Sequence, residues 1–382
     1  MGPLAGLKVV EFFGLGPTPM TAMLLSDLGA TVIKIDRPSP SNTGIHRPTR
    51  FNLMARGRSS VIVDLKQAEG IDLILSLLEK ADALIEGHRP GTMERLGLGP
   101  DVVMARNPRL IYGRMTGWGQ EGILAKAAGH DLNYIALSGA LRAIGRKDSK
   151  PTPPLNLVGD FGGGALYLAL GITSAIIERQ RSGKGQVIDA AVIDGTASMM
   201  TVFYGLLSAG LYNLEHGRNI LDSGSPIYDV YECADGAYIS VAAIEEKFQA
   251  ELFRLLGLQV SAYDRANLAV LLEEKFRTKT RAEWCEILEG TDACFAPVLS
   301  MEEAPLHPQN RTRGTFVEID GVVQPAPAPR FSRTPPSSPL PPESEGASTI
   351  KALLEWGIPN EQVDRLKTAG VIAEKMKLAS SN

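Results

Sequence analysis

Short apolar runs alternate with helical spacing over the first ninety residues, and this alternation limits the fold more than any other feature. The β-branched runs and the helical patterns between them are, in order, residues 7–12, 22–28, 31–35, 60–64, 70–79 and 83–85. Strands that alternate with helices pair as a parallel sheet, because each helix crosses over one face. We therefore predict an α/β chain whose large domain is Rossmann-like, with a doubly wound parallel sheet.

A different pattern begins after residue 224. Residues 228–233 and 238–242 flank the turn pair Asp235-Gly236, which predicts a β-hairpin, and helical spacing follows. We therefore expect a second, smaller α+β domain. The predicted boundaries are a large domain over 1–200, a linker helix over 201–224, the small domain over 225–318, and a return linker over 319–382 whose C-terminal helices pack on the large domain.

Charge balance and cysteine count exclude several classes of protein. The formal net charge is -4, and no basic stripe alternates with aromatic residues, so we expect no nucleic-acid partner. Cys233, Cys285 and Cys294 are too dispersed for a disulfide framework or a metal site. They predict no bound metal and an intracellular, reducing compartment. Cytoplasm, mitochondrion and peroxisome stay open, because residues 379–382 form no clear peroxisomal signal.

One uncharged run, residues 195–214, is long enough to cross a membrane. It is only weakly hydrophobic, because Ser, Thr, Tyr, Asn and Gly interrupt it. We therefore predict a buried helix here and no membrane span.

The first predicted strand ends in a glycine turn that imitates a dinucleotide-binding fingerprint. Gly14 and Gly16 follow the strand, and Asp36 ends the next one. The third glycine is missing, and Pro17 and Pro19 stand where backbone N–H groups would approach a pyrophosphate. We therefore favour a structural turn, leave a non-nicotinamide nucleotide open, and predict no nicotinamide cofactor.

Two segments offer groups for acid/base chemistry. His130 lies between a glycine and a carboxylate, and an imidazole exchanges protons near neutral pH. Asp160 precedes three glycines and an apolar helical pattern. A lone histidine is commonly a surface or core residue, and an aspartate at a helix start is commonly an N-cap. Three successive glycines, however, are costly there unless something must approach the backbone closely.

A third carboxylate, at Glu245 in the second domain, completes the candidate set. The sequence contains no Ser-His-Asp elbow, no cysteine nucleophile, no metal-ligand spacing and no phosphate loop. Proton transfer by His130 and Asp160 is therefore the chemistry that the sequence favours.

At these residues the chain resembles the α-methylacyl-CoA racemases, within the wider family III CoA-transferase fold. The resemblance runs almost end to end. The matching stretches are residues 9–11 with Gly14 and Pro17, 35–38, 86–91, 96–100, 115–120, 129–131, 156–164, 183–190, 243–245, and 291–294 with 297–299.

The resemblance implies an isomerase that interconverts (2R)- and (2S)-2-methylacyl-CoA thioesters by moving one proton through an enolate. It implies that His130 and Asp160 are acid/base groups on opposite faces of the α-carbon, with no cofactor beyond the CoA of the substrate. It also implies an interlocked homodimer, in which Glu245 reaches in from the partner subunit and orients His130.

The same resemblance assigns the binding residues. The expected CoA and acyl contacts are Arg37, Lys66, Arg89, Asp131, Asn156 and Tyr228. Two of these, Arg37 and Arg89, suit phosphates on chemical grounds, since a guanidinium grips them bidentately. We expect the enolate oxygen to be stabilised by backbone N–H groups at the start of the helix, at Asp160, Phe161 and Gly162.

Three residues depart from the family pattern. Thr18 stands where relatives usually have a glycine, Ile227 replaces an aromatic residue, and Glu246 replaces a proline. Ile227 and Glu246 line the expected approach of the acyl chain, so they bear on chain preference rather than on reaction type.

Two alternatives keep the fold but change the function. One is a family III CoA-transferase, in which Asp160 attacks the thioester to form an anhydride. The other is a non-catalytic CoA-binding homologue. A transferase needs no imidazole at His130, and a binding protein needs neither proton carrier, so the presence of both favours the racemase.

Overall fold

The computed structural model describes residues 2–39, 44–259 and 267–374, and the chain forms two compact units. Unit 1 comprises Met1–Ser138, Leu155–Met199 and Gly314–Asn382, and unit 2 comprises Gly139–Pro154 and Met200–Arg313. The chain therefore leaves unit 1 twice. The predicted large domain over 1–200 missed the first of these excursions, since residues 139–154 cluster with unit 2.

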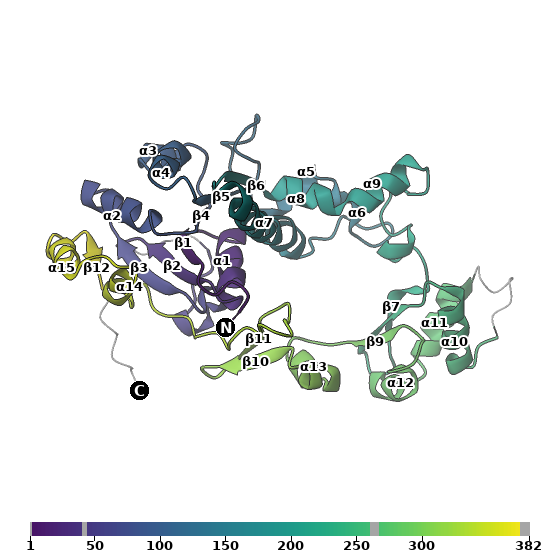
Figure 1. Cartoon of the computed structure of the whole chain (residues 1–382). Helices are drawn as coiled ribbons and strands as arrows, with labels where there is room; N and C mark the ends of the chain where they lie inside the picture. The colour runs from purple at the N-terminus through teal and green to yellow at the C-terminus, as the bar shows by residue number, and fades with distance from the viewer. Residues whose placement is uncertain (1, 40–43, 260–266, 375–382) are drawn as a thin grey trace. The chain divides into compact units, whose positions relative to one another are not determined.

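Unit 1 is built on a seven-stranded sheet in the order β12-β3-β2-β1-β4-β5-β6 (Figure 1). The strands are β1 Lys8–Phe12, β2 Thr31–Asp36, β3 Ser59–Val63, β4 Ala83–Glu86, β5 Ile111–Thr116, β6 Val187–Ala191 and β12 Ile372–Ala373. The six longer strands are parallel, and β12 pairs antiparallel with β3. The predicted α/β fold with a parallel sheet is confirmed.

Helices cover both faces of this sheet and bury an apolar core on each. Val9 packs into one core and its neighbour Val10 into the other, because successive strand residues point to opposite faces. The helices are α1 Pro17–Asp27 and α7 Tyr167–Ser182 on the Val9 face, and α2 Ala68–Leu78, α4 Pro100–Arg106, α14 Thr349–Glu355 and α15 Asn360–Thr368 on the Val10 face.

The remaining elements of unit 1 surround the carboxyl ends of the strands or follow the second excursion. They are α3 Thr92–Arg95, α5 Asp131–Leu137, a π-helical segment Leu157–Leu166, α8 Val192–Met199, and the antiparallel hairpin β10 Phe316–Ile319 and β11 Val322–Pro325.

Unit 2 contains a three-stranded antiparallel sheet in the order β7-β8-β9. The strands are β7 Tyr228–Glu232, β8 Tyr238–Ala242 and β9 Phe295–Val298, and the helices are α6 Ala140–Ala143, α9 Thr201–Ser208, α10 Glu246–Leu256, α11 Leu268–Phe276, α12 Arg281–Leu288 and α13 Pro308–Arg313. Trp284 and Phe276 are almost fully buried and pack edge to face, 5.3 Å between ring centroids. The predicted β-hairpin and the α+β character of this unit are confirmed.

The prediction of one buried helix over residues 195–214 is wrong. The run forms two helices separated at Met200, and only α8 is buried in part, at Val192, Gly195 and Thr196. Helix α9 has no buried residue and ends at Ser208, so the predicted linker helix over 201–224 is α-helical only in its first third, and a single 3-10 turn follows at Ile220–Asp222. Helix α8 packs closely at Gly195, where a Cβ would lie 1.9 Å from the Gly163 carbonyl oxygen, whereas nothing among the described residues lies within 4 Å of a Cβ on Gly205 in α9.

One helical stretch among the described residues, Leu157–Ser182, is long and apolar enough to cross a membrane by length and composition. Its Leu168 and Ile172 are fully buried against the sheet, whereas Leu170 and Ile177 are exposed.

Candidate active site

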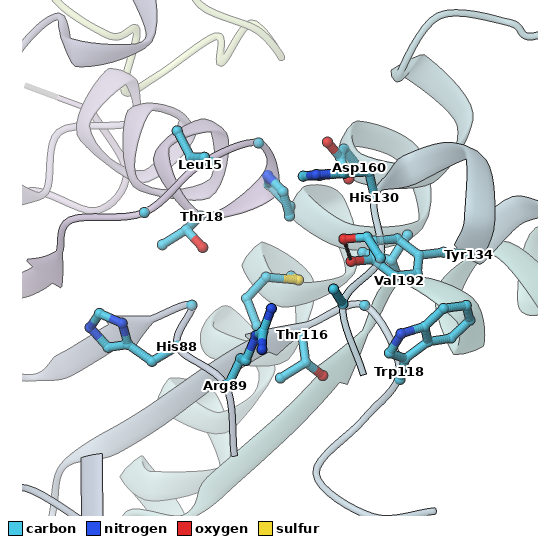
Figure 2. Close-up of a pocket in the computed structure, with 18 of the residues that line it drawn as sticks. Leu15, Thr18, His88, Arg89, Thr116, Trp118, His130, Tyr134, Asp160 and Val192 are labelled. Atoms are coloured by element: carbon cyan, nitrogen blue, oxygen red, sulfur yellow. Dashed lines mark hydrogen bonds between the residues drawn. The ribbon is translucent and has the colours of Figure 1, made fainter. Parts of the chain in front are cut away.

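The carboxyl ends of the parallel strands open into a cavity of about 470 Å³. It lies where the strand order reverses between β1 and β4, the position at which open α/β sheets usually bind ligands. Residues that follow β1, β2, β4, β5 and β6 line it, together with His130 and Asp160 (Figure 2). Two distant segments of sequence therefore bring the two predicted proton carriers to one cavity.

His130 is held by its backbone and presents an exposed ring to the cavity. It occupies the N-cap position of α5, where its N–H donates to Asn133 Oδ1 at 3.0 Å. Four residues later, the Tyr134 hydroxyl donates to the Gly129 carbonyl, and the Tyr134 ring packs edge to face on Trp118 at 4.7 Å. These contacts fix the chain on both sides of His130.

Asp160 lies inside the π-helical segment rather than at its N-cap, a position occupied by Asn156. The π-type hydrogen bond runs from the Phe161 N–H to the Asn156 carbonyl at 3.2 Å. The N–H of Asp160 donates to Asp131 Oδ1 at 2.6 Å, and Asn156 Nδ2 donates to Asp160 Oδ2 at 3.3 Å. Asp131 and Asn156, expected as pocket contacts, are not among the residues that line the cavity and instead support the turn that carries Asp160.

Burial raises the pKa of Asp160 to about 6. The Asn156 hydrogen bond opposes this rise, the charge of Asp131 adds to it, and His130 opposes it. The carboxyl group can therefore exist in both protonation states near neutral pH, as a group that takes and returns a proton must.

Two of the glycines after Asp160 let other helices approach the backbone closely, as three successive glycines predicted. A Cβ on Gly163 would lie 2.4 Å from Thr196 Oγ1, and a Cβ on Gly164 would lie 2.9 Å from Pro17 Cβ. They admit α8 and α1, because a larger residue would push these helices away.

The geometry gives no support to the expected enolate donors. The Asp160 N–H and the Phe161 N–H already have acceptors in Asp131 and Asn156. Gly162 packs against Met199, whose sulfur would lie 3.3 Å from a Cβ at position 162. Neither Phe161 nor Gly162 is among the described residues that line the cavity.

The loop after β1 closes over Asp160. Gly16 has φ +60 and ψ -112, and a Cβ there would lie 2.5 Å from Asp160 Oδ2. The glycine turn is therefore needed for close approach to a carboxylate of this chain, in agreement with its interpretation as a structural turn. Asp36 offers no ribose contact, because it is buried, pairs with Lys34 at 3.0 Å and accepts from the Ser60 hydroxyl at 2.6 Å.

Arg37 and Arg89 line the same cavity as exposed cations after β2 and β4. The Arg37 guanidinium lies over the Phe13 ring, 5.5 Å from its centroid. Buried Glu86 anchors the segment before Arg89, since one oxygen accepts from Arg114 Nε at 2.9 Å and the other from the His88 N–H at 2.7 Å.

Three further predicted site residues lie away from both the cavity and the Asp160 turn. Lys66 follows β3 as an exposed side chain and is not among the residues that line the cavity, and its N–H donates to Asp64 Oδ1 at 3.0 Å. Tyr228 begins β7 and Glu245 precedes α10, both in unit 2. Their predicted roles remain predictions.

Four residues that line the cavity were not predicted from the sequence as site residues: Thr18, His88, Trp118 and Tyr134. His88 is half-buried, and burial and the charge of Arg37 lower its pKa. Thr18 is buried, and its hydroxyl fills the space that a Cβ on Gly87 would need, at 2.3 Å. The signal for His88 and Trp118 was their position just after a parallel strand.

The fold and this cavity define the class of protein to which the chain belongs. The family model for CoA-transferase family III matches residues 4–347, and the chain belongs to that family.

Two relatives and one solved structure are similar over nearly the whole chain. Alpha-methylacyl-CoA racemase of Mus musculus is 43% identical, with 98% of this chain and 99% of the relative covered. Alpha-methylacyl-CoA racemase of Homo sapiens is 42% identical, with 99% of each covered. A CaiB/BaiF family protein from Brucella suis superimposes with a TM-score of 0.82 at 28% identity, covering 93% of this chain and 99% of that one.

Proposed function

We propose that this protein interconverts (2R)- and (2S)-2-methylacyl-CoA thioesters by proton transfer at C2. The observation that carries the proposal is the presence of two proton carriers of different type, His130 and Asp160, on one cavity. They lie close enough for His130 to lower the pKa of Asp160. The names of the two racemase relatives support the same reaction.

Each proton carrier has a defined part in this reaction. A thioester α-proton is weakly acidic, so one group removes it and leaves a planar enolate. The other group then returns a proton to the opposite face, which inverts C2. With a pKa near 6, Asp160 serves as base when ionised and as acid when protonated.

The CoA part of the substrate is recognised by the cationic side of the cavity. Arg37 and Arg89 suit its phosphates, since guanidinium groups bind phosphate oxygens in pairs. Lys66 lies further along the same edge of the sheet and serves the nucleotide end. The reaction requires no cofactor, because the α-proton moves between side chains alone.

We further propose a homodimer in which Glu245 of one subunit orients His130 of the other. Helix α9 supports this, because it is apolar and has no buried residue: Val202 is 58% and Tyr204 is 51% exposed. Such a surface is what a subunit interface covers. An intracellular compartment fits the three free cysteines.

The test uses one epimer of a 2-methylacyl-CoA in D2O, without added metal, nicotinamide or carboxylic acid. We expect deuterium at C2 together with formation of the other epimer, followed by mass spectrometry and chiral chromatography. His130→Ala and Asp160→Ala should each lower inversion by about 100-fold to 10,000-fold. If C2 takes up no label and CoA instead moves to an added carboxylic acid, Asp160 acts as the nucleophile of a transferase.

A further inference from the structure

The chain between the two candidate proton carriers makes an excursion through unit 2. Helix α5 starts beside His130 and ends at Leu137, residues 139–154 belong to unit 2, and the π-helical segment with Asp160 begins at Leu157. The covalent path from one carrier to the other therefore runs through this excursion.

The point of return is conformationally strained. Leu155 has φ +58, a left-handed conformation that a leucine adopts only when its surroundings impose it. The next residue is Asn156, whose amide donates to Asp160 Oδ2. Whatever holds residues 139–154 therefore also sets the start of the Asp160 turn.

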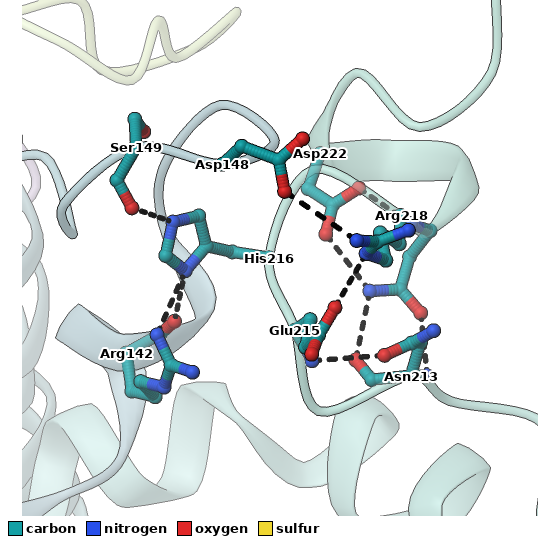
Figure 3. Close-up of polar contacts among 9 residues, drawn as sticks. Arg142, Asp148, Ser149, Asn213, Glu215, His216, Arg218 and Asp222 are labelled. Carbon is teal, nitrogen blue, oxygen red and sulfur yellow. Dashed lines mark hydrogen bonds and ion pairs between the residues drawn. The ribbon is translucent and has the colours of Figure 1, made fainter.

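The buried ring of His216 holds this excursion (Figure 3). His216 is only 5% exposed. Its Nε2 lies 3.0 Å from the Ser149 carbonyl oxygen, and its Nδ1 lies 3.1 Å from the Arg142 carbonyl oxygen and 3.3 Å from Arg142 Nη1. One imidazole thus joins both ends of the segment 142–149.

With the ring proton on Nε2, Nε2 donates to the Ser149 carbonyl oxygen, and Nδ1 accepts from the Arg142 guanidinium. Both ends of the segment 142–149 are then bonded to one ring.

Two glycines allow the chain to pack closely around the His216 ring. A Cβ on Gly145 would lie 2.7 Å from His216 Cδ2. Gly217 has φ +70, and a Cβ there would lie 2.1 Å from the Lys147 backbone nitrogen. The two loops therefore meet backbone to backbone around the imidazole.

The loop that carries His216 is itself braced. Asn219 Oδ1 accepts from the Asn213 N–H at 2.8 Å, Asn219 Nδ2 donates to the Asn213 carbonyl at 3.0 Å, and the Asn219 N–H donates to Asp222 Oδ1 at 2.7 Å. At the rim, exposed Arg218 pairs with Asp148 at 3.4 Å and with Glu215 at 2.5 Å. His216 is therefore a fixed point against which the excursion is held.

We infer that His216 is a positioning residue for proton transfer: by tethering residues 142–149 it sets the Leu155–Asn156 junction, and through it the place of Asp160 relative to His130. The inference rests on the proposed racemase function. It differs from a purely structural role, because it predicts a change in the balance between the two proton transfers.

The test compares His216→Phe, which keeps the ring volume but removes both hydrogen bonds, with His216→Gln, whose amide can donate to Ser149 and accept from Arg142. Asp148→Asn, in the segment 142–149, is the matched control, because it removes only the charge of an exposed ion pair with Arg218, which contributes little, and leaves both ring contacts in place. For each variant, kcat, KM and the ratio of deuterium uptake to inversion at C2 are measured from a single epimer in D2O.

We expect His216→Phe to lower kcat by about 10-fold to 100-fold, as a small misplacement of a reacting group does, with KM changed by less than about twofold. Its ratio of exchange to inversion should rise, because one carrier no longer faces the enolate correctly. His216→Gln should recover kcat to within about threefold of the unmodified protein, and Asp148→Asn should match that protein.

An unchanged ratio in a folded His216→Phe protein overturns the inference, whether or not kcat or the melting temperature falls. If His216→Phe does not fold, Gly145→Ala displaces the ring while keeping its chemistry, and the same rise in the ratio is required of it. Absence of exchange in the unmodified protein would instead contradict the proposed function, so the two failures are distinguishable.

Discussion

The carboxyl group of Asp160 is surrounded by neighbours that act on its charge in opposite directions. Burial and the carboxylate of Asp131 favour the protonated form, while the Asn156 amide and His130 favour the ionised form. With the resulting pKa of about 6, most Asp160 carboxyl groups are ionised at neutral pH, and a minor fraction is protonated and can act as an acid. A carboxyl group with an ordinary pKa of 3.8 would be a weaker base and could seldom return a proton.

The raised pKa of Asp160 predicts a pH-dependent cost to folding. The folded-state pKa of about 6 lies above the ordinary value of 3.8. The contribution of the protonated Asp160 carboxyl group to the free energy of unfolding is therefore fully present below pH 3.8 and is lost as pH rises through 6. Asp160→Asn removes this loss. We expect the variant to melt at least about 2 °C above the unmodified protein at pH 8 and close to it at pH 4. A melting difference that is the same at both pH values would contradict the raised pKa.

Asp131 acts on Asp160 both by charge and by hydrogen bond, and two variants separate these effects. Asp131→Asn removes the charge but keeps an acceptor for the Asp160 N–H, so the pKa of Asp160 should fall and the acid limb of the pH–rate profile should move to lower pH. Asp131→Ala also removes the acceptor, which should cost about 1.5–3 kcal/mol of unfolding free energy in urea denaturation. If the acid limb stays in place in Asp131→Asn, that limb does not report Asp160.

At the scale of whole elements, the sequence predicted those strands whose environment is uniform. β1 to β4 are largely buried, and each contains a run of Val, Ile or Leu, such as Val9–Val10 in β1 and Val61–Val63 in β3, so their type and order could be predicted. β5 contains Gly113 and Arg114, and β6 contains Asp189, so neither gave such a run. Arg114 is nevertheless buried, because Glu86 and Glu94 pair with it.

The types of the candidate proton carriers could be predicted from the sequence, but the contacts that hold them in place could not. His130 and Asp160 could be selected because imidazole and carboxylate suit proton transfer. The π-helical turn could not be predicted, since its extra residue per turn depends on the Asn156 carbonyl and on packing against α8. The role of Asp131 beneath Asp160 likewise arises only when α5 meets that turn.

The turn between β1 and α1 requires a glycine at position 16, and this can be tested. In Gly16→Ala the new Cβ would meet Asp160 Oδ2 at 2.5 Å, so the carboxylate must move. We expect kcat to fall by about 100-fold, as misplacement of a reacting group does. Gly6→Ala is the matched control: its φ is +91, but nothing lies within 4 Å of the added Cβ.

Both glycine variants should lose similar stability, about 1–2 kcal/mol, from the left-handed backbone alone. Only Gly16→Ala should lose turnover. Equal activity of the two proteins, measured by deuterium uptake at C2, would show that the approach of Gly16 to Asp160 is not needed for the reaction.

At the scale of the molecule, the proton carriers and their expected orienting residue lie on different units. His130 and Asp160 belong to unit 1, and Glu245 belongs to unit 2. The sequence could assign each residue to its unit, because the strand patterns of the two parts differ. It could not say whether a complete site is formed within one chain or between two, since that depends on assembly.

The proposed homodimer makes a distinct prediction when two inactive chains are combined. If Glu245 of one subunit serves His130 of the other, a heterodimer of His130→Ala and Glu245→Ala chains has one site with both substitutions and one site with neither. Separately tagged, doubly purified heterodimers should therefore show about half of the unmodified activity, measured as deuterium uptake at C2. If Glu245 served His130 within its own chain, every site would carry one substitution and no activity would return. The two homodimeric variants are the controls, and size-exclusion chromatography with light scattering should give about twice the 41.0 kDa chain mass for each of them.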